Sequence, residues 1–409
     1  MIRKNKKATK NFIWNAVGLT FNSFNSLFFL VAVKLINGMN EAGVFTYAFS
    51  LCCLFYMIAI FYNRTYQVSD TEGRFDFSDY LSLRLILSTV SFVLIFIFSL
   101  VSGFDFHKIL VILLLMGFRI VEAISDCFYG ELHKKGRLDQ TGISLFVKAI
   151  FGLGIFIGLD LLTRNILVAI AGIVVLNFAI LNLYDIRNYR KISHDEIKFK
   201  TSNIKSLLKN SWPVFVFSVL GVFLANCQKY VLTYFADNDI QAIFGMLIMP
   251  ATVISLAGSY LVNPFVGKLT EIKNKKKYAE FRDFGRKLIF AVLEIGILGL
   301  IVCGFIGIPV LNFVYQIDLN EYWLLLEVII VGAIFTAVAM FPSAFLTILR
   351  ENKVQSIIYA IISAASLALS IILIPFYGIT GAVIAYMVAG ALLLLMYIIK
   401  YIRTIERLR

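Results

Sequence analysis

Charged side chains occur inside several long apolar runs of this sequence, and they are the residues best placed to do chemistry. Arg119 is followed by Glu122 and Asp126 at spacings of three and four residues, so a helix would carry all three on one face. Lys148 and Lys229 lie inside two other runs. A charge at the centre of a bilayer costs about 2.5–3.5 kcal/mol or more, and it persists only where it meets a partner, a wet cavity or a ligand. These charges therefore mark the candidate functional site.

Further polar residues accompany these charges. Asn226 lies one helical turn before Lys229, and Lys34 lies toward the end of the first apolar run. Asn22 and Asn25 belong to that same first run, where they would line a cavity or form hydrogen bonds between helices. Lys34 is close enough to the run's end to extend its ammonium group into the interface instead. Both interpretations stay open for these residues.

The charged residues also have structural interpretations. Arg119 and Glu122 could form an internal ion pair that fixes two helices, or they could contact a substrate, and the sequence favours neither. Lys148 and Lys229 lie deeper in their runs, so we expect both to face a cavity. We also expect Gly152 and Gly154 to permit close helix packing rather than to bind a phosphate.

Other kinds of chemistry find little support. The three histidines lie in different polar segments, and the five cysteines lack disulfide or metal-site spacing. The segments on one side of the apolar runs are short and poor in catalytic residue types. We therefore expect no enzymatic activity, no metal site and no cofactor. The net charge of +13 comes from short basic segments between apolar runs, which is the pattern of membrane topology rather than of nucleic-acid binding.

Long apolar runs must position these residues. The chain is 60% hydrophobic and only 15% charged, and runs of about 20 residues recur from residue 11 to residue 400. Because hydrocarbon offers backbone amides no water, each run is expected to form a helix. The sequence thus predicts an all-α polytopic membrane protein with about 12 transmembrane helices. The predicted spans are 12–36, 41–62, 82–102, 109–127, 142–160, 165–184, 212–235, 239–262, 287–314, 322–347, 353–375 and 378–400.

The distribution of lysine and arginine predicts the orientation. Basic residues are retained in the cytoplasm, and they concentrate in one alternate set of the segments between spans. An even number of spans places both ends of the chain on that side. We therefore expect both termini to be cytoplasmic. The basic segments lie within residues 3–10, 134–137, 187–209, 268–287 and 403–409.

A polar connection divides the predicted spans into two sets of six. We expect an amino-terminal lobe at 1–184, a cytoplasmic linker at 185–211 and a carboxy-terminal lobe at 212–409. A weak internal repeat supports the division, because Asn15 precedes Lys34 by the same interval by which Asn210 precedes Lys229. Same-sense repeats of this kind are typical of transporters whose two lobes enclose a central cavity.

Several motifs resemble one known family. The stretch Leu367–Ala385, which includes Pro375-Phe-Tyr-Gly-Ile-Thr-Gly-Ala and follows Leu349-Arg-Glu-Asn-Lys353, resembles the last two helices of the bacterial polysaccharide flippases. These carry O-antigen and capsule repeat units, and they share a superfamily with the multidrug and toxic compound extruders. The segments from Asn15 to Phe45 and from Tyr129 to Arg137 are similar to the corresponding parts of that family.

The resemblance implies an inner-membrane flippase that moves an undecaprenyl-pyrophosphate-linked oligosaccharide to the outer leaflet by alternating access. It implies a cavity whose cations, here Arg119, Lys148, Lys229 and Lys34, meet the head group. It further implies an H⁺ or Na⁺ gradient as the driving force, with Glu122 or Asp126 as candidate carriers. A polysaccharide polymerase and chain-length proteins are further candidate partners.

Two alternatives stay open. The first is an ion-coupled multidrug exporter on the same fold, although its cavity would be expected to hold carboxylates and aromatic residues for cationic drugs. The second is a membrane assembly protein that transports nothing, in which the charges within the spans would be purely structural.

Overall fold

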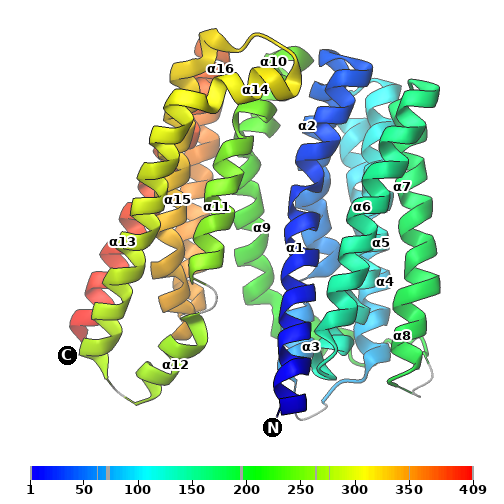
Figure 1. The fold of residues 1–409 in the computed structure, drawn as a ribbon, viewed down its shortest axis with the longest axis vertical. Helices are drawn as coiled ribbons and strands as arrows, with labels where there is room; N and C mark the ends of the chain where they lie inside the picture. Colours follow the sequence, from blue (N-terminus) through cyan, green and yellow to red (C-terminus); the bar gives the residue numbers. More distant parts are fainter. Residues whose placement is uncertain are drawn as a thin grey trace. The chain divides into compact units, whose positions relative to one another are not determined.

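The computed structural model describes residues 2–61, 63–70, 74–193, 197–262, 265–275, 277–349 and 351–407. Within these residues the chain forms helices and no β-strand, which confirms the predicted all-α class (Figure 1). The chain divides into two compact units, Met1–Val219 and Leu220–Arg409.

The first unit contains eight helices, one π-helical turn and the start of a ninth helix. Helix α3 is short, and α7, η1 and α8 follow one another as one segment, Ile166–Arg190. The elements are α1 (Ile2–Asn37), α2 (Met39–Ile60), α3 (Asn63–Ser69), α4 (Phe77–Val101), α5 (Phe106–Lys134), α6 (Leu138–Thr163), α7 (Ile166–Ile180), the π-helical turn η1 (Leu181–Asp185), α8 (Ile186–Arg190) and α9 (Ile204–Phe235).

The second unit begins inside α9. Its helices are interrupted by one π-helical turn and one 3₁₀ turn. The elements are α10 (Asn238–Leu247), α11 (Met249–Val262), α12 (Val266–Asn274), α13 (Tyr278–Val302), the π-helical turn η3 (Cys303–Gly307), α14 (Ile308–Tyr315), the 3₁₀ turn η4 (Asn320–Tyr322), α15 (Trp323–Ile348) and α16 (Asn352–Arg407).

Ten helical segments of the described chain are long and apolar enough to cross a membrane, so the protein is a multi-pass membrane protein. Helix α5 is not among the ten because it carries several charges, yet it contains the predicted span 109–127. Helix α16 contains two predicted spans. Each of the twelve predicted spans therefore falls on a described helix or on consecutive helical elements, while twelve crossings stay a prediction.

Helix α16 is a helical hairpin. Its backbone leaves the helical region at Gly378, where φ is 54° and ψ is −129°. The Tyr397 hydroxyl donates a hydrogen bond to Gln355 Oε1 at 3.2 Å, so residues 42 positions apart lie side by side. Because glycine adopts positive φ without strain and Pro375 lacks an amide proton, the Pro-Phe-Tyr-Gly sequence is suited to the reversal.

Helices α1 and α6 approach each other closely within the first unit, as Figure 1 shows. A Cβ atom on Gly142 would lie 2.1 Å from the Trp14 carbonyl oxygen, and one on Gly18 would lie 2.2 Å from the Gly142 carbonyl oxygen. By contrast, a Cβ on Gly152 or Gly154 would meet no described atom within 4 Å. The prediction that Gly152 and Gly154 mediate close packing is therefore wrong. The close contact lies near the start of α6 instead.

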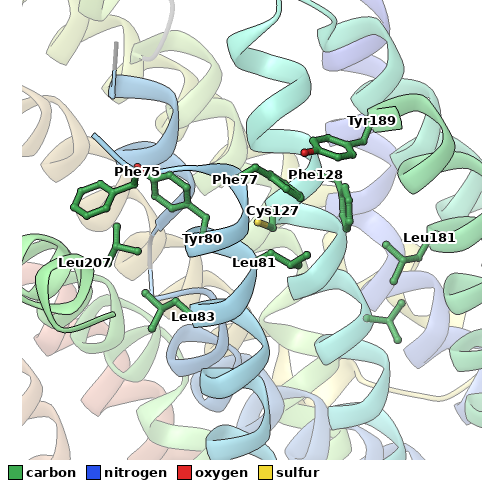
Figure 2. Packing of buried hydrophobic residues seen from close by; sticks show 11 residues of the cluster. Phe75, Phe77, Tyr80, Leu81, Leu83, Cys127, Phe128, Leu181, Tyr189 and Leu207 are labelled. Carbon is green, nitrogen blue, oxygen red and sulfur yellow. The ribbon is translucent and has the colours of Figure 1, made fainter. Parts of the chain in front are cut away.

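A cluster of buried side chains holds the helices of the first unit together near the start of α4 (Figure 2). Phe77 of α4 stacks on Tyr189 of α8 with ring centroids 4.2 Å apart. Phe128 of α5 meets the same tyrosine edge to face. Leu207 of α9 joins the cluster with no exposed surface. The beginning of α9 is thus packed into the first unit.

The chain preceding α9 is hydrogen-bonded to the first turns of α4. The Lys198 amide donates to Ser78 Oγ at 3.1 Å, and the Lys200 amide donates to Ser82 Oγ at 2.8 Å. Asn203 Nδ2 donates to Asp79 Oδ2 at 3.0 Å. The described parts of the predicted linker therefore belong to the first unit, and residues 194–196 lie outside the described chain. The expected division into lobes 1–184 and 212–409, joined by a linker at 185–211, stays a proposal.

The contact between α1 and α6 yields a stability prediction. Gly142→Ala places a methyl group against a backbone carbonyl and is expected to destabilise the protein by about 1–3 kcal/mol, as overpacking does. Gly152→Ala in the same helix adds a methyl group in open space and serves as the matched control. Thermal unfolding of the purified protein in detergent measures the difference. Equal melting temperatures for the two variants would contradict the packing.

Candidate functional site

One face of α5 carries three charged residues inside a predicted span. Arg119, Glu122, Asp126 and Tyr129 follow one another at spacings of three, four and three residues. Arg119 Nη1 donates to Glu122 Oε2 at 2.6 Å along this face. The structure contains the Arg119–Glu122 ion pair, but both residues lie on α5, so this pair does not itself join two helices. A substrate contact for Arg119 stays a prediction.

Helix α2 surrounds the Arg119 guanidinium with aromatic rings. The guanidinium carbon lies 4.5 Å from the ring centroid of Phe49 and 5.5 Å from that of Tyr56. Arg119 Nη2 also donates to Cys53 Sγ at 3.1 Å. Cation–π contacts stabilise an arginine that is shielded from water. Helix α2 thus shares in the neutralisation of Arg119.

Asp126 is shared by two arginines from two other helices. Arg84 of α4 donates to Asp126 Oδ2 at 3.2 Å, and Arg64 of α3 donates to Asp126 Oδ1 at 3.0 Å. The Arg84 side chain is almost completely buried, whereas 28% of the Arg64 side chain is exposed. Each carboxylate oxygen therefore has a charged donor of its own, and Arg64 is the donor that solvent reaches.

The α5 charge cluster, comprising Arg64, Arg84, Arg119, Glu122 and Asp126, holds one net positive charge. Three guanidinium groups face two carboxylates. Positive charge from the cluster extends to the carboxy-terminal end of α5, where burial and the nearby charge of Arg64 lower the pKa of His133. An anion that entered the cluster would meet a site already biased toward it.

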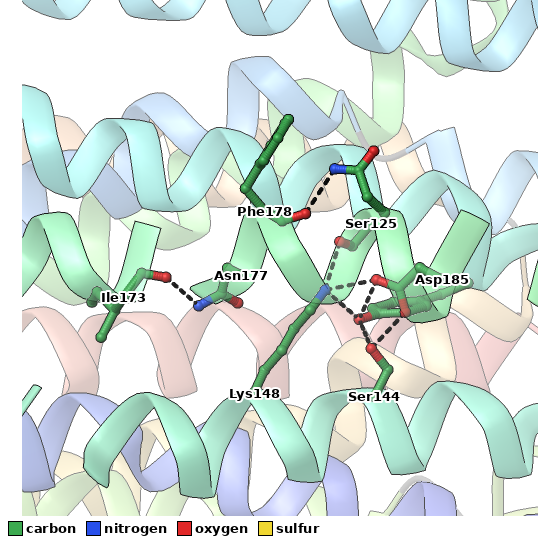
Figure 3. Close-up of polar contacts among 9 residues, drawn as sticks. Ser125, Ser144, Lys148, Ile173, Asn177, Phe178 and Asp185 are labelled. Atoms are coloured by element: carbon green, nitrogen blue, oxygen red, sulfur yellow. Dashed lines mark hydrogen bonds and ion pairs between the residues drawn. The ribbon is translucent and has the colours of Figure 1, made fainter. Parts of the chain in front are cut away.

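Lys148 of α6 lies in a second buried network (Figure 3). Its ammonium group lies 2.7 Å from Asp185 Oδ2, 2.6 Å from Ser125 Oγ and 3.0 Å from the Tyr129 hydroxyl. Only 5% of the Lys148 side chain is exposed, and none of the Asp185 side chain is. Ser144 Oγ donates a further hydrogen bond to Asp185 Oδ1 at 2.6 Å.

The three hydrogens of the Lys148 ammonium group match its three oxygen partners, which leaves no donor for a ligand in this arrangement. Asp185 is the last residue of the π-helical turn η1, where the extra residue alters the helical register. The turn allows α7 and α8 to continue as one rod while Asp185 faces α6. Direct contact between Lys148 and a substrate stays a prediction that requires this network to open.

The remaining predicted residues do not join these two networks. In the second unit, half-buried Lys229 donates to Asn226 Oδ1 at 3.4 Å, while Asn226 Nδ2 donates to the Val222 carbonyl of its own helix at 3.1 Å. In α1, Lys34 and Asn22 are half-buried and Asn25 is buried. A substrate-binding role for these residues stays a prediction.

Three charged residues of these networks did not figure among the predicted site residues. Arg84 lies inside the predicted span 82–102, so the rule that selected Lys148 could have found it. Asp185 directly follows the predicted span 165–184 and was assigned to the linker. Arg64 follows its span by two residues and had no distinguishing signal. Within the described residues, no cluster of histidine, cysteine and acidic side chains is suited to hold a metal ion.

The sequence comparisons place these networks in a family context. The model of the family described as polysaccharide biosynthesis protein matches residues 74–267, which include both networks apart from Arg64. The chain is also 23% identical over 403 residues to the capsular polysaccharide biosynthesis protein CapF of Staphylococcus aureus, covering 96% of this chain and 99% of that protein. The family resemblance is confirmed.

Solved structures support the same fold. The lipid II flippase MurJ in an inward closed conformation aligns with a TM-score of 0.72 at 16% identity, over 97% of this chain and 90% of MurJ. An inward-facing multidrug resistance MATE family transporter also gives a TM-score of 0.72, at 13% identity and over 97% and 98% of the two chains. The chain therefore has a MATE- and MurJ-like fold.

The Lys148 network predicts a structural cost for mutation. Lys148→Met leaves Asp185 charged and buried without its ammonium partner, which is expected to cost about 3–5 kcal/mol. The double variant Lys148→Met with Asp185→Leu removes both charges and should recover much of that loss. Thermal unfolding in detergent, together with protein level in the membrane, measures both effects. A single variant as stable as the parent protein would show that the pair does not hold α6 and α7 together.

Proposed function

We propose that this protein is a flippase that moves an undecaprenyl-pyrophosphate-linked oligosaccharide from the cytoplasmic to the outer leaflet of the bacterial inner membrane. The observation that carries the proposal is the match to a capsular polysaccharide biosynthesis protein over nearly the full length of both chains. The MurJ-like fold adds support, because MurJ is a lipid II flippase.

The chemistry of the α5 charge cluster suits such a cargo. A sugar pyrophosphate is anionic and strongly hydrated, so it needs charged donors to replace water, while its polyprenyl tail stays in lipid. Arg64 and Arg119 present guanidinium groups, which bind phosphate oxygens through paired hydrogen bonds. A phosphate that replaced Asp126 as the partner of Arg64 would leave Asp126 paired with Arg84. Lys229 and Lys34 are the other cations that we assign to the head group.

The transport cycle follows from the proposed topology. Both termini lie in the cytoplasm, and the two halves of the molecule alternate access to their binding residues. A proton or sodium gradient drives the cycle. A polysaccharide polymerase and chain-length proteins would take over the exported repeat unit.

An ion-coupled multidrug exporter is the second candidate, since a MATE transporter shares the fold. Fold likeness alone does not distinguish the two cargoes. The net positive charge of the α5 charge cluster favours an anion over a cationic drug, because the cluster's two carboxylates are already paired with arginines.

The proposal predicts a defect in glycan export. Arg119→Gln and Lys229→Gln should each lower surface glycan by at least about tenfold and cause lipid-linked oligosaccharide to accumulate inside, because a hydrogen bond to a charged group contributes about 1.5–3 kcal/mol. Surface glycan is measured by immunolabelling of a deletion strain that carries each variant, with protein level checked by blotting.

Lys275→Gln is the matched control. Lys275 is exposed, lies outside the spans and pairs with Glu271 at 2.6 Å, so its loss should leave display unchanged. If the two span variants display normal amounts of glycan, the assignment of cavity cations is wrong. If even the deletion strain displays normal glycan, the proposed cargo is wrong.

A further inference from the structure

Four helix ends meet at the end of the first unit opposite the amino terminus. Asn37 ends α1 and Glu41 begins α2, with Gly38 at φ 93° between the two helices. His107 lies in the first turn of α5, and Asp160 lies in the last turn of α6. Under the predicted orientation this is the outer face of the membrane.

These side chains form two pairs at the same group of helix ends. His107 Nε2 lies 2.9 Å from Glu41 Oε2, and Asn37 Nδ2 donates to Asp160 Oδ1 at 3.0 Å. Exposure falls along the series, from 41% for the His107 side chain to 23% for Glu41 and none for Asp160. Burial therefore increases from His107, which solvent reaches, to the fully buried carboxyl group of Asp160.

The inner pair has more acceptors than donors. Asp160 Oδ2 and Asn37 Oδ1 are both buried, and neither has a hydrogen-bond partner among the described residues. A buried oxygen without a partner costs roughly 1–3 kcal/mol. One proton on Asp160 would convert Oδ2 from an unpaired acceptor into a donor. This imbalance distinguishes Asp160 from Glu122 and Asp126, each of which pairs with arginine.

The helix dipoles act in opposite directions on the two carboxyl groups, Glu41 and Asp160. Glu41 lies in the first turn of α2, where the partial positive charge of the helix stabilises a carboxylate. Asp160 lies in the last turn of α6, where the partial negative charge opposes one. A negative charge on Glu41 also repels a negative charge on Asp160. The helix dipoles thus favour a negative charge at the position of Glu41 and disfavour one at the position of Asp160.

Other charged groups near these helix ends have different surroundings. The Lys108 ammonium lies over the rings of Tyr47 and Phe104, 4.6 and 4.7 Å from their centroids. The Arg164 amide donates to the Asp160 carbonyl, so it caps the backbone of α6. Lys34 lies one turn before Asn37 on α1. On α7, the Asn165 side chain accepts from the Leu167 amide.

We propose that Asp160 is a proton-binding site and that His107 and Glu41 relay the proton between solvent and Asp160. The proton passes from the imidazolium of His107 to the Glu41 carboxylate and then to Asp160, and it returns by the same route, so no other reactant is needed. The role of this proton as the coupling ion of transport rests on the proposed function. It would enter from the outer side of the membrane.

Infrared spectroscopy of the purified full-length protein in detergent tests the site without any glycan. In spectra recorded between about pH 5 and pH 8, the interval in which histidine changes charge, the C=O band of a buried protonated carboxyl group should be present at the acidic end and be lost as the pH rises. Asp160→Asn should abolish the band, and the control Asp239→Asn, an exposed carboxylate of the second unit, should leave it. A band that survives Asp160→Asn, or its absence from the parent protein, overturns the proposal.

Two further variants test the relay in case Asp160→Asn unfolds. Glu41→Gln removes the neighbouring negative charge, so the band should disappear at a lower pH than in the parent protein. His107→Gln should slow exchange of the carboxyl proton with heavy water without removing the band. Unchanged behaviour in both variants overturns the relay.

Glycan display separates this inference from the proposed function. If the parent protein restores display and Asp160→Asn, present at a normal level, does not, the proton is coupled to transport. Equal display by both proteins overturns the coupling role. If the parent protein fails to restore display, the proposed function fails, while the infrared result still decides whether Asp160 binds a proton.

Discussion

A bilayer cannot solvate an ionic group, and this constraint governs the arrangement of the charges in the α5 charge cluster and around Lys148. Helix α5 carries an arginine and two carboxylates along one face, and α2, α3 and α4 supply the rings and guanidinium groups that neutralise them. The same helix contributes Ser125 and Tyr129 to the network around Lys148. Packing of the first unit thus depends on pairing of the α5 charges.

The Lys148 network and the α5 charge cluster differ in whether a ligand could replace one of their internal partners. All three donors of Lys148 are used and the pair is sealed from solvent, so it is suited to hold α6 and α7 in register. The α5 charge cluster has a surplus cation and an arginine that solvent reaches. Carboxylates in such a cluster hold the arginines in place until a stronger anionic ligand competes for them. A pyrophosphate-linked glycan is a ligand of this kind.

Much of the fold could be predicted from the sequence because the bilayer imposes a simple rule. Apolar runs of sufficient length form helices, and each predicted span corresponds to one, including the hairpin at Gly378. Pairing between residues far apart in the sequence could not be predicted. Asp185 was assigned to a loop because periodicity does not reveal a π-helical turn, and without it Lys148 appeared to need a cavity. Close packing at Gly142 rather than at Gly152 likewise depends on which turn faces α1, which spacing alone does not specify.

The most direct test of the account is translocation by the purified protein in liposomes that contain an undecaprenyl-pyrophosphate oligosaccharide. Glycan exposed on the outer leaflet can be measured with a lectin that does not cross the membrane. The account predicts exposure that requires the protein and falls when Arg119 is replaced by glutamine. It would be contradicted if the glycan stayed in its original leaflet while the same liposomes transported a cationic drug.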